Sequence, residues 1–236
     1  MSRHAEPPLT PLPSGLLNRI WDWAYGLGYG ALRATVLLVF RPLFLVRRVG
    51  PPPAVPDGGW ILCANHASYL DPAFLQLVLE HRIVFVMTID FYARPWGRWF
   101  FRLVGAIPVA SGRLAKQGLE KAVRLLRKGT PIAIFPEGRL SPDGAFSAPQ
   151  RGVAVIARMG RAPILPAGIY GNLSAWPKGA PRPRRSDVRI AFGPLLDPPV
   201  AQPPGRQEER AYTKRIMDAV AQARELARST GNGARP

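Results

Sequence analysis

The sequence predicts an α/β fold: a mostly parallel sheet flanked by helices, preceded by an apolar, amphipathic helical segment at the N-terminus. Short apolar runs such as 60–64 and 131–135 are bounded by Pro or Gly turn residues, which is typical of buried parallel strands. These runs alternate with segments of helical periodicity, which favours parallel strands joined by right-handed helical crossovers. At 236 residues the chain fits one such domain with a substantial core.

Composition limits the classes of function. The single cysteine, Cys63, excludes an internal disulfide framework and a CxxC metal site, and residues 1–8 lack the order of a signal peptide. We therefore expect a reducing, cytoplasmic location. The net charge of +17 predicts an anionic partner, either nucleic acid or the cytoplasmic face of a membrane.

The N-terminal part has two expected sections. Residues 1–14 are Pro-rich and are expected to form a disordered lead-in. Residues 15–48 are apolar and aromatic with six charges, which fall within an arc of about 120° on an ideal helix. A cationic stripe opposite Trp, Phe and Leu is typical of a helix lying in the membrane interface. The alternative is a helical hairpin that packs on the core of the domain.

A Pro/Gly linker over 50–59 leads to a domain expected over 60–195, and a second linker at 197–206 leads to a docking helix over 207–228. Helices are expected at 72–80, within 91–103, and at 114–128 and 150–159. Strands are expected at 60–64, 82–88, 106–110, 131–135, 163–169 and 187–192.

Two motifs follow apolar runs, where the ligand sites of parallel sheets lie. Residues 65–71 place His66 five positions before Asp71, and residues 135–138 place Glu137 on a Pro/Gly turn. His66 is the most credible general base, because imidazole titrates near neutrality and a carboxylate can orient it. Alternatively, Asp71 is a helix cap followed by Pro72 at the first helical position.

Two arginines also follow strand ends. Arg113 comes after the run at 105–109, and Arg139 comes after Gly138. The planar guanidinium suits a phosphate, because it donates paired hydrogen bonds. The alternatives are an exposed residue at a helix start for Arg113 and, for Glu137, a loop carboxylate paired with one of many arginines.

Four blocks, at 65–71, 105–113, 135–138 and 163–169, resemble in order and spacing the PlsC-type glycerolipid acyltransferases, the 1-acylglycerol-3-phosphate acyltransferases. The resemblance implies that His66 is the general base and that Asp71 orients it. It also implies that the arginine of the second block, Arg113, together with Glu137 and Gly138, engages the acceptor and its phosphate. Compared with the family pattern, the arginine of the second block lies further from its glycine, and the arginine of the third lies one place earlier, at Arg139.

The implied reaction moves a fatty acyl group from acyl-CoA or acyl-acyl carrier protein to the free hydroxyl of 1-acylglycerol-3-phosphate, giving phosphatidic acid in phospholipid synthesis. No metal or bound cofactor is expected. The expected place is the cytoplasmic face of the cell membrane, in peripheral or monotopic form, with an anionic membrane surface as partner. The displaced arginines leave a different lysolipid acceptor open. Two competing hypotheses are a basic nucleic-acid-binding protein and a catalytically silent membrane-binding relative.

Overall fold

A computed structural model of the chain describes residues 30, 38, 43–51, 53–93, 98–109, 113–199 and 205–230. The chain divides into two compact units, Met1–Val39 and Phe40–Pro236, and the fold below is that of the second unit. The predicted lead-in over 1–14 and most of the predicted segment over 15–48 lie outside the described residues.

A single seven-stranded sheet forms the centre of this unit. The pair β6–β7 is antiparallel and every other neighbouring pair is parallel, so β1 and β7 run opposite to the remaining strands. Across the sheet, the strands are β1 (Phe44–Val49), β7 (Ser186–Phe192), β6 (Ile164–Tyr170), β2 (Ile61–Ala64), β5 (Ile132–Ile134), β3 (Val84–Thr88) and β4 (Ile107–Val109). This is the predicted α/β class with a mostly parallel sheet.

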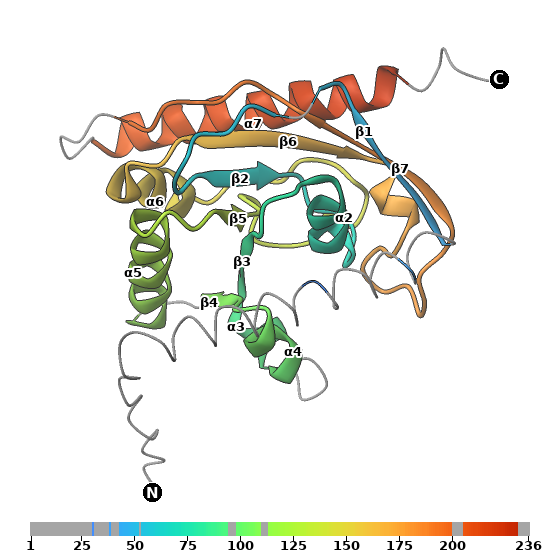
Figure 1. Ribbon diagram of the computed structural model, residues 1–236, viewed down its shortest axis with the longest axis horizontal. Helices are drawn as coiled ribbons and strands as arrows, with labels where there is room; N and C mark the ends of the chain where they lie inside the picture. The colour runs from blue at the N-terminus through green and yellow to red at the C-terminus, as the bar shows by residue number, and fades with distance from the viewer. Residues whose placement is uncertain are drawn as a thin grey trace, which may run out of the picture. The chain divides into compact units, whose positions relative to one another are not determined.

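Helices cover both faces of the sheet (Figure 1). The helix α2 (Asp71–Val78) packs on one face, against β1 and β7. The other face carries α5 (Arg113–Arg127), α6 (Gly152–Gly160) and α7 (Arg206–Ser229). Three short helices complete the described part of the unit: α3 (Ile89–Tyr92), α4 (Arg98–Leu103) and the 3-10 turn η1 (Asn172–Ser174).

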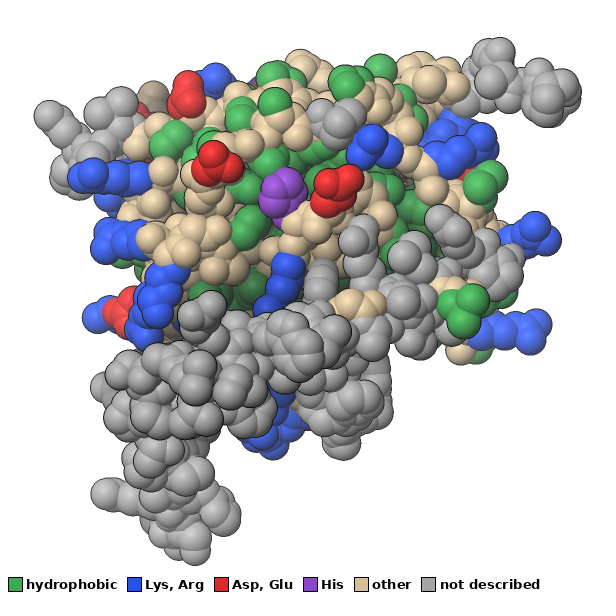
Figure 2. Space-filling model, in the orientation of Figure 1, with side chains coloured by type: hydrophobic (Ala, Val, Ile, Leu, Met, Phe, Trp, Pro, Cys, Tyr) green, Lys and Arg blue, Asp and Glu red, His purple; other side chains and the backbone are tan. Residues whose placement is uncertain are grey.

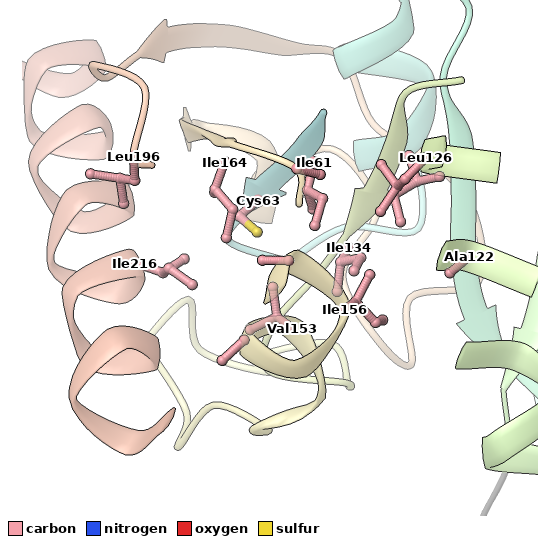
Figure 3. Packing of buried hydrophobic residues seen from close by; sticks show 14 of the residues in the cluster. Ile61, Cys63, Ala122, Leu126, Ile134, Val153, Ile156, Ile164, Leu196 and Ile216 are labelled. Carbon is pink, nitrogen blue, oxygen red and sulfur yellow. The ribbon is translucent and has the colours of Figure 1, made fainter. Parts of the chain in front are cut away.

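Strand alternation divides the core into two clusters. Ile61 and Cys63 of β2 face the layer of α5, α6 and α7, whereas Leu62 and Ala64 face the layer of α2. In the first cluster, Ile216 of α7 points toward the β-strand side chains (Figure 3). Burial on both faces explains why these strands read as continuous apolar runs.

Each strand and helix expected within 60–195 has an observed counterpart. The bounds differ by at most two residues except in the region 91–103, where α4 covers only 98–103. One expectation is wrong: residues 44–48, predicted as the end of a helical segment, belong to the strand β1. The register pairs Phe44 with Ser186, so the strand conformation comes from pairing with a distant part of the chain. No helix among the described residues is long and apolar enough to cross a membrane.

Candidate active site

The site forms where β2, β5 and β6 end. Their arrowheads point in the same direction, toward α2 in the view of Figure 1. The loop after β2 carries His66 and the loop after β5 carries Glu137, so residues 71 positions apart become neighbours. The Asn65 side chain ties the end of β2 to β6, donating to and accepting from the Ile169 main chain at 3.0 and 2.8 Å.

His66 and Asp71 are in direct contact. The His66 Nδ1 atom lies 2.9 Å from Asp71 Oδ2, and the Asp71 side chain is fully buried. Because an ionised carboxylate only accepts hydrogen bonds, Nδ1 carries the proton and donates it. The Nε2 atom is then left with a free lone pair, which is the requirement for a general base.

The Asp71 carboxylate is held from several directions. Its Oδ2 atom also accepts from the main-chain N–H groups of Ala67 and Ser68, at 2.8 and 2.9 Å. Its Oδ1 atom accepts from Asn172 Nδ2 at 2.8 Å. The N-cap residue of α2 is Leu70, which makes no side-chain capping hydrogen bond, and Asp71 is the first helical residue, so the alternative that Asp71 is the helix cap is wrong. Its oxygens point back toward the preceding loop, where His66 lies.

The His66 ring is also fixed by packing. It stacks on the Phe135 ring, with centroids 3.9 Å apart and an angle of 12° between the planes. The side chain keeps 18% exposure. The ring is therefore oriented on one side by a carboxylate and on one face by an aromatic ring, while part of it stays accessible.

Glu137 is buried and engages the main chain. Its Oε1 accepts from the His66 N–H at 3.4 Å and its Oε2 accepts from the Ser147 N–H at 2.8 Å. A further bond runs from the Ser141 N–H to the His66 carbonyl at 2.7 Å. These contacts join the two motif loops. The structure thus places Glu137 beneath the surface of the site.

Gly138 and Arg139 reach the site surface. Gly138 has φ +66°, and a Cβ atom there would clash with Gln150 Nε2, so the turn favours glycine. Arg139 is exposed and donates to Ser147 Oγ at 3.4 Å. Arg113 begins α5 after the end of β4, but its side chain lies outside what the structure describes. Its contact with an acceptor stays a prediction.

A cavity of about 330 Å³ opens beside His66. Gly138 and Arg139 also line it, whereas Glu137 does not. Most of its wall is apolar and comes from β3, β4, β5, α5 and α6, for example from Phe85, Val109, Leu119, Ile134, Val153 and Ile156. The site therefore combines a base at the edge with an apolar interior.

Two further observations bear on the chemistry. Burial raises the pKa of the Cys63 thiol, which is fully buried, so this residue is not available as a nucleophile. Within the described ranges, no group of three or more His, Cys, Asp or Glu side chains is placed to hold a metal ion.

Comparison with known proteins identifies the family of the chain. The family model described as Acyltransferase matches residues 46–170, which is more than half of the chain. The chain belongs to the Acyltransferase family. The resemblance predicted from the four blocks and the predicted class of enzyme, an O-acyltransferase, are thereby confirmed.

Individual relatives are distant. The chain is 25% identical over 167 residues to the 1-acyl-sn-glycerol-3-phosphate acyltransferase of Bacillus subtilis (strain 168), covering 70% of this chain and 80% of that protein. It is 26% identical over 126 residues to the chloroplastic 1-acyl-sn-glycerol-3-phosphate acyltransferase BAT2 of Brassica napus, covering 52% of this chain and 36% of the relative.

A solved structure shares the fold. It is the crystal structure of the 1-acyl-sn-glycerophosphate (LPA) acyltransferase, PlsC, from Thermotoga maritima, with a TM-score of 0.68 and 23% identity. The match covers 87% of this chain and 82% of that one. It supports the mostly parallel α/β architecture described above.

Sequence reasoning left one residue of the site out. Asn172 lies 101 positions from Asp71 and beyond the fourth block, which ends at residue 169. The sequence carries no local signal for its contact with Asp71, because that contact depends on where β6 ends relative to α2.

Proposed function

We propose that this acyltransferase moves a fatty acyl group from an acyl thioester to the free hydroxyl of a lysophospholipid, in the first place 1-acylglycerol-3-phosphate, giving phosphatidic acid. The observation that carries the proposal is the His66–Asp71 pair at the edge of an apolar cavity. The names of the relatives in Bacillus and Brassica support this acceptor.

His66 Nε2 accepts the proton of the acceptor hydroxyl, and the oxygen attacks the thioester carbonyl carbon. Asp71 stabilises the imidazolium that forms, as the carboxylate does in a Ser-His-Asp triad. The tetrahedral intermediate collapses, the C–S bond breaks, and the imidazolium returns the proton to the leaving thiolate. The acyl group thus passes directly to the acceptor, without a covalent enzyme intermediate.

The cavity is proposed to hold the acyl chain of the donor. Its walls carry Phe85, Leu119 and Ile156, which favour hydrocarbon over water. The acyl donor is proposed to be acyl-CoA or acyl-acyl carrier protein. Arg139, at the surface of the cavity, and Arg113, at the start of α5, are proposed to bind the acceptor phosphate.

Glu137 is given a different role from the one that the resemblance implies. Both carboxylate oxygens accept main-chain hydrogen bonds, and the residue is 3% exposed. We therefore propose that it acts on the acceptor indirectly, by holding the loop of His66 against the loop of Gly138 and Arg139.

The test is acyl transfer from a labelled acyl thioester to 1-acylglycerol-3-phosphate in anionic vesicles, comparing the native chain with His66→Ala. Transfer that the substitution abolishes would support the reaction and the base. Equal transfer by both proteins would reject His66 as the base. A panel of other lysolipid acceptors tests the alternative that the positions of Arg113 and Arg139 leave open, namely an acceptor with a different head group.

We also propose that the protein works at an anionic membrane surface, on the cytoplasmic face. A cationic segment, 178–185, lies in the loop between η1 and β7, and its side chains Lys178, Arg182, Arg184 and Arg185 are exposed. The Trp176 carbonyl before it accepts hydrogen bonds from Tyr69 N–H at 3.1 Å and Ser68 Oγ at 3.3 Å. The segment is thereby anchored to the loop that carries His66.

Apolar side chains accompany these charges. Leu43 and Leu45 are 44% and 54% exposed, and the Ser186 N–H, which follows the cationic segment, donates to the Leu43 carbonyl at 3.4 Å. Figure 2 shows Lys and Arg side chains beside hydrophobic ones at the end of the molecule where β1 and β7 lie. Cations next to exposed leucines fit an anionic lipid surface.

A further inference from the structure

The amide of Asn172 completes the hydrogen bonding of the Asp71 carboxylate. Three donors reach Asp71 Oδ2, namely His66 Nδ1 and the N–H groups of Ala67 and Ser68. Among the described residues, Asn172 Nδ2 is the donor that reaches Oδ1, at 2.8 Å. Asp71 is 0% exposed and Asn172 is 2% exposed, so water does not replace this bond.

The backbone around Asn172 orients its side-chain amide. Asn172 is the first residue of η1 and follows Gly171, which has φ +80°. A Cβ atom at position 171 would clash with the Asp187 carbonyl oxygen, so the tight turn between β6 and η1 requires glycine. The Asn172 carbonyl accepts from the Ala175 N–H at 2.9 Å, which closes the turn. The amide is therefore held by main-chain geometry on one side and by the carboxylate on the other.

We infer that Asn172 is a positioning residue of the catalytic base, acting on His66 through Asp71. A buried carboxylate is costly unless donors surround it, and each donor favours its ionised form. With Oδ1 held by Asn172, Oδ2 faces His66 in one orientation. The Nδ1 atom then keeps its proton and Nε2 stays the free base. This role rests on the proposed function, in which His66 accepts the hydroxyl proton.

Loss of the hydrogen bond between Asn172 and Asp71 is expected to shift the pH–rate profile in one direction. The active form of the pair contains neutral His66 and ionised Asp71. Without a donor at Oδ1, this form is destabilised more than the form with imidazolium, in which a full positive charge compensates the carboxylate. Protonation of the pair then becomes easier, and the acid limb of the pH–rate profile moves to higher pH.

The first variant is Asn172→Leu, which has a similar size and no donor. We expect kcat to fall about 10- to 100-fold, the range of one hydrogen bond to a charged group. We expect KM to change little, because Asn172 is absent from the cavity lining. The acid limb is expected to move up by about one pH unit or less.

The control is Thr213→Val in α7. This side chain is also buried, at 2% exposure, and its hydroxyl donates to the Glu209 carbonyl at 2.7 Å, within its own helix and away from His66 and Asp71. A general loss of packing would affect both variants alike, whereas only Asn172→Leu is expected to move the pH profile. If both variants leave the profile of the native chain unchanged, the inference is wrong.

A second variant keeps the test decisive if Asn172→Leu does not fold. In Asn172→Asp, the new carboxyl can donate to Asp71 while it is protonated, and two adjacent buried carboxylates share one proton. Activity is therefore expected to hold just above the acid limb, where His66 is neutral and the two carboxyls still share a proton, and to fall at a higher pH where the native chain is still fully active. An alkaline limb identical to that of the native chain would overturn the inference.

A spectroscopic measurement separates this inference from the proposed function. The chain has three histidines, so the nitrogen resonances of His66 can be assigned by comparison with His66→Ala. We expect one tautomer, protonated at Nδ1, in the native chain and a mixture of tautomers in Asn172→Leu. This result is readable even if no lysolipid is acylated. Identical His66 spectra in the two proteins would reject the positioning role, whereas inactivity of the native chain on every acceptor would reject the proposed function alone.

Discussion

Asp71 shows how much of the chemistry depends on a single carboxylate. In Asp71→Asn, the side chain can donate to His66 Nδ1, which would stabilise the wrong tautomer and leave Nε2 protonated. We expect kcat to fall about 10³- to 10⁴-fold with little change in binding of the acceptor. Steady-state kinetics together with the unfolding midpoint check this prediction. A variant that stays folded and keeps its kcat would show that Asp71 does not orient the base.

Cys63 supplies a residue-scale prediction about pH. Burial raises the pKa of its thiol, so the folded state binds the thiol proton more tightly than the unfolded state. This contribution to stability is complete below the ordinary thiol pKa, about 8.5, and is lost as the pH rises beyond it. We therefore expect the free energy of unfolding to fall more between pH 7 and pH 10 in the native chain than in Cys63→Ala. Urea titrations of both proteins at the two pH values measure the difference, and equal losses would contradict it.

The sequence anticipated the contact of His66 with Asp71, because the two residues lie in one short turn and their contact follows from local geometry. It did not anticipate the donor at Asn172, 101 positions away from Asp71. It also could not show that Glu137 is buried, because this depends on how the loop after β5 packs against the loop after β2. Contacts between distant segments are set by the sheet order, which periodicity does not reveal.

At the scale of elements, α7 was expected to dock by one face, and its buried residues do lie at helical spacing. Ile216 is fully buried in the cluster that also contains Cys63 and Ile164 (Figure 3). We expect Ile216→Ala to lower the free energy of unfolding by about 2–5 kcal/mol, because it removes packing and leaves a cavity. Denaturant unfolding measures the change.

The matched control for this prediction is Lys214→Ala in the same helix. Lys214 pairs with Asp218 at 2.7 Å, but the two side chains are 76% and 54% exposed. An exposed pair of this kind contributes about 0–1 kcal/mol. If the two variants lose the same stability, α7 is not held by its apolar face.

The strand β1 shows where reasoning from periodicity failed. Residues 44–48 lie in an apolar and basic stretch that fits a helix with a cationic stripe, yet they pair with β7 in parallel. Phe44 is buried against Phe74 of α2, with ring centroids 5.3 Å apart, whereas Leu45 is exposed. A short edge strand with one covered face alternates over few residues, so its pattern is hard to distinguish from a helical one. Periodicity likewise does not reveal that β1 and β7 run opposite to the other strands.

At the scale of the whole molecule, the distribution of charge predicts that the cationic segment 178–185 binds anionic membranes. We expect reversal of Arg182, Arg184 and Arg185 to glutamate to weaken binding to vesicles that contain phosphatidylglycerol, roughly 1 kcal/mol for each cation near the surface. Sedimentation with vesicles measures this loss, and it should shrink as the salt concentration rises.

The control reverses three exposed cations of α5 and the turn after it, Lys121, Arg124 and Lys128, and changes the net charge of +17 by the same amount. Figure 1 shows α5 at the opposite end of the sheet from β1 and β7. Equal losses in both variants would show that overall charge, and not the segment beside the site, governs binding. Binding of the native chain to duplex DNA without binding to vesicles would favour the nucleic-acid alternative.

The hydrogen bonds between the two motif loops have a consequence for local unfolding. The His66 N–H bonds to Glu137, the Ser141 N–H bonds to the His66 carbonyl, and Glu137 also holds the Ser147 N–H. Neither loop can open without exposing polar groups of the other, so we expect the two to exchange their amide hydrogens as one cooperative unit. The base and the surface that is proposed to bind phosphate would then become disordered together, and a partly opened molecule would retain neither.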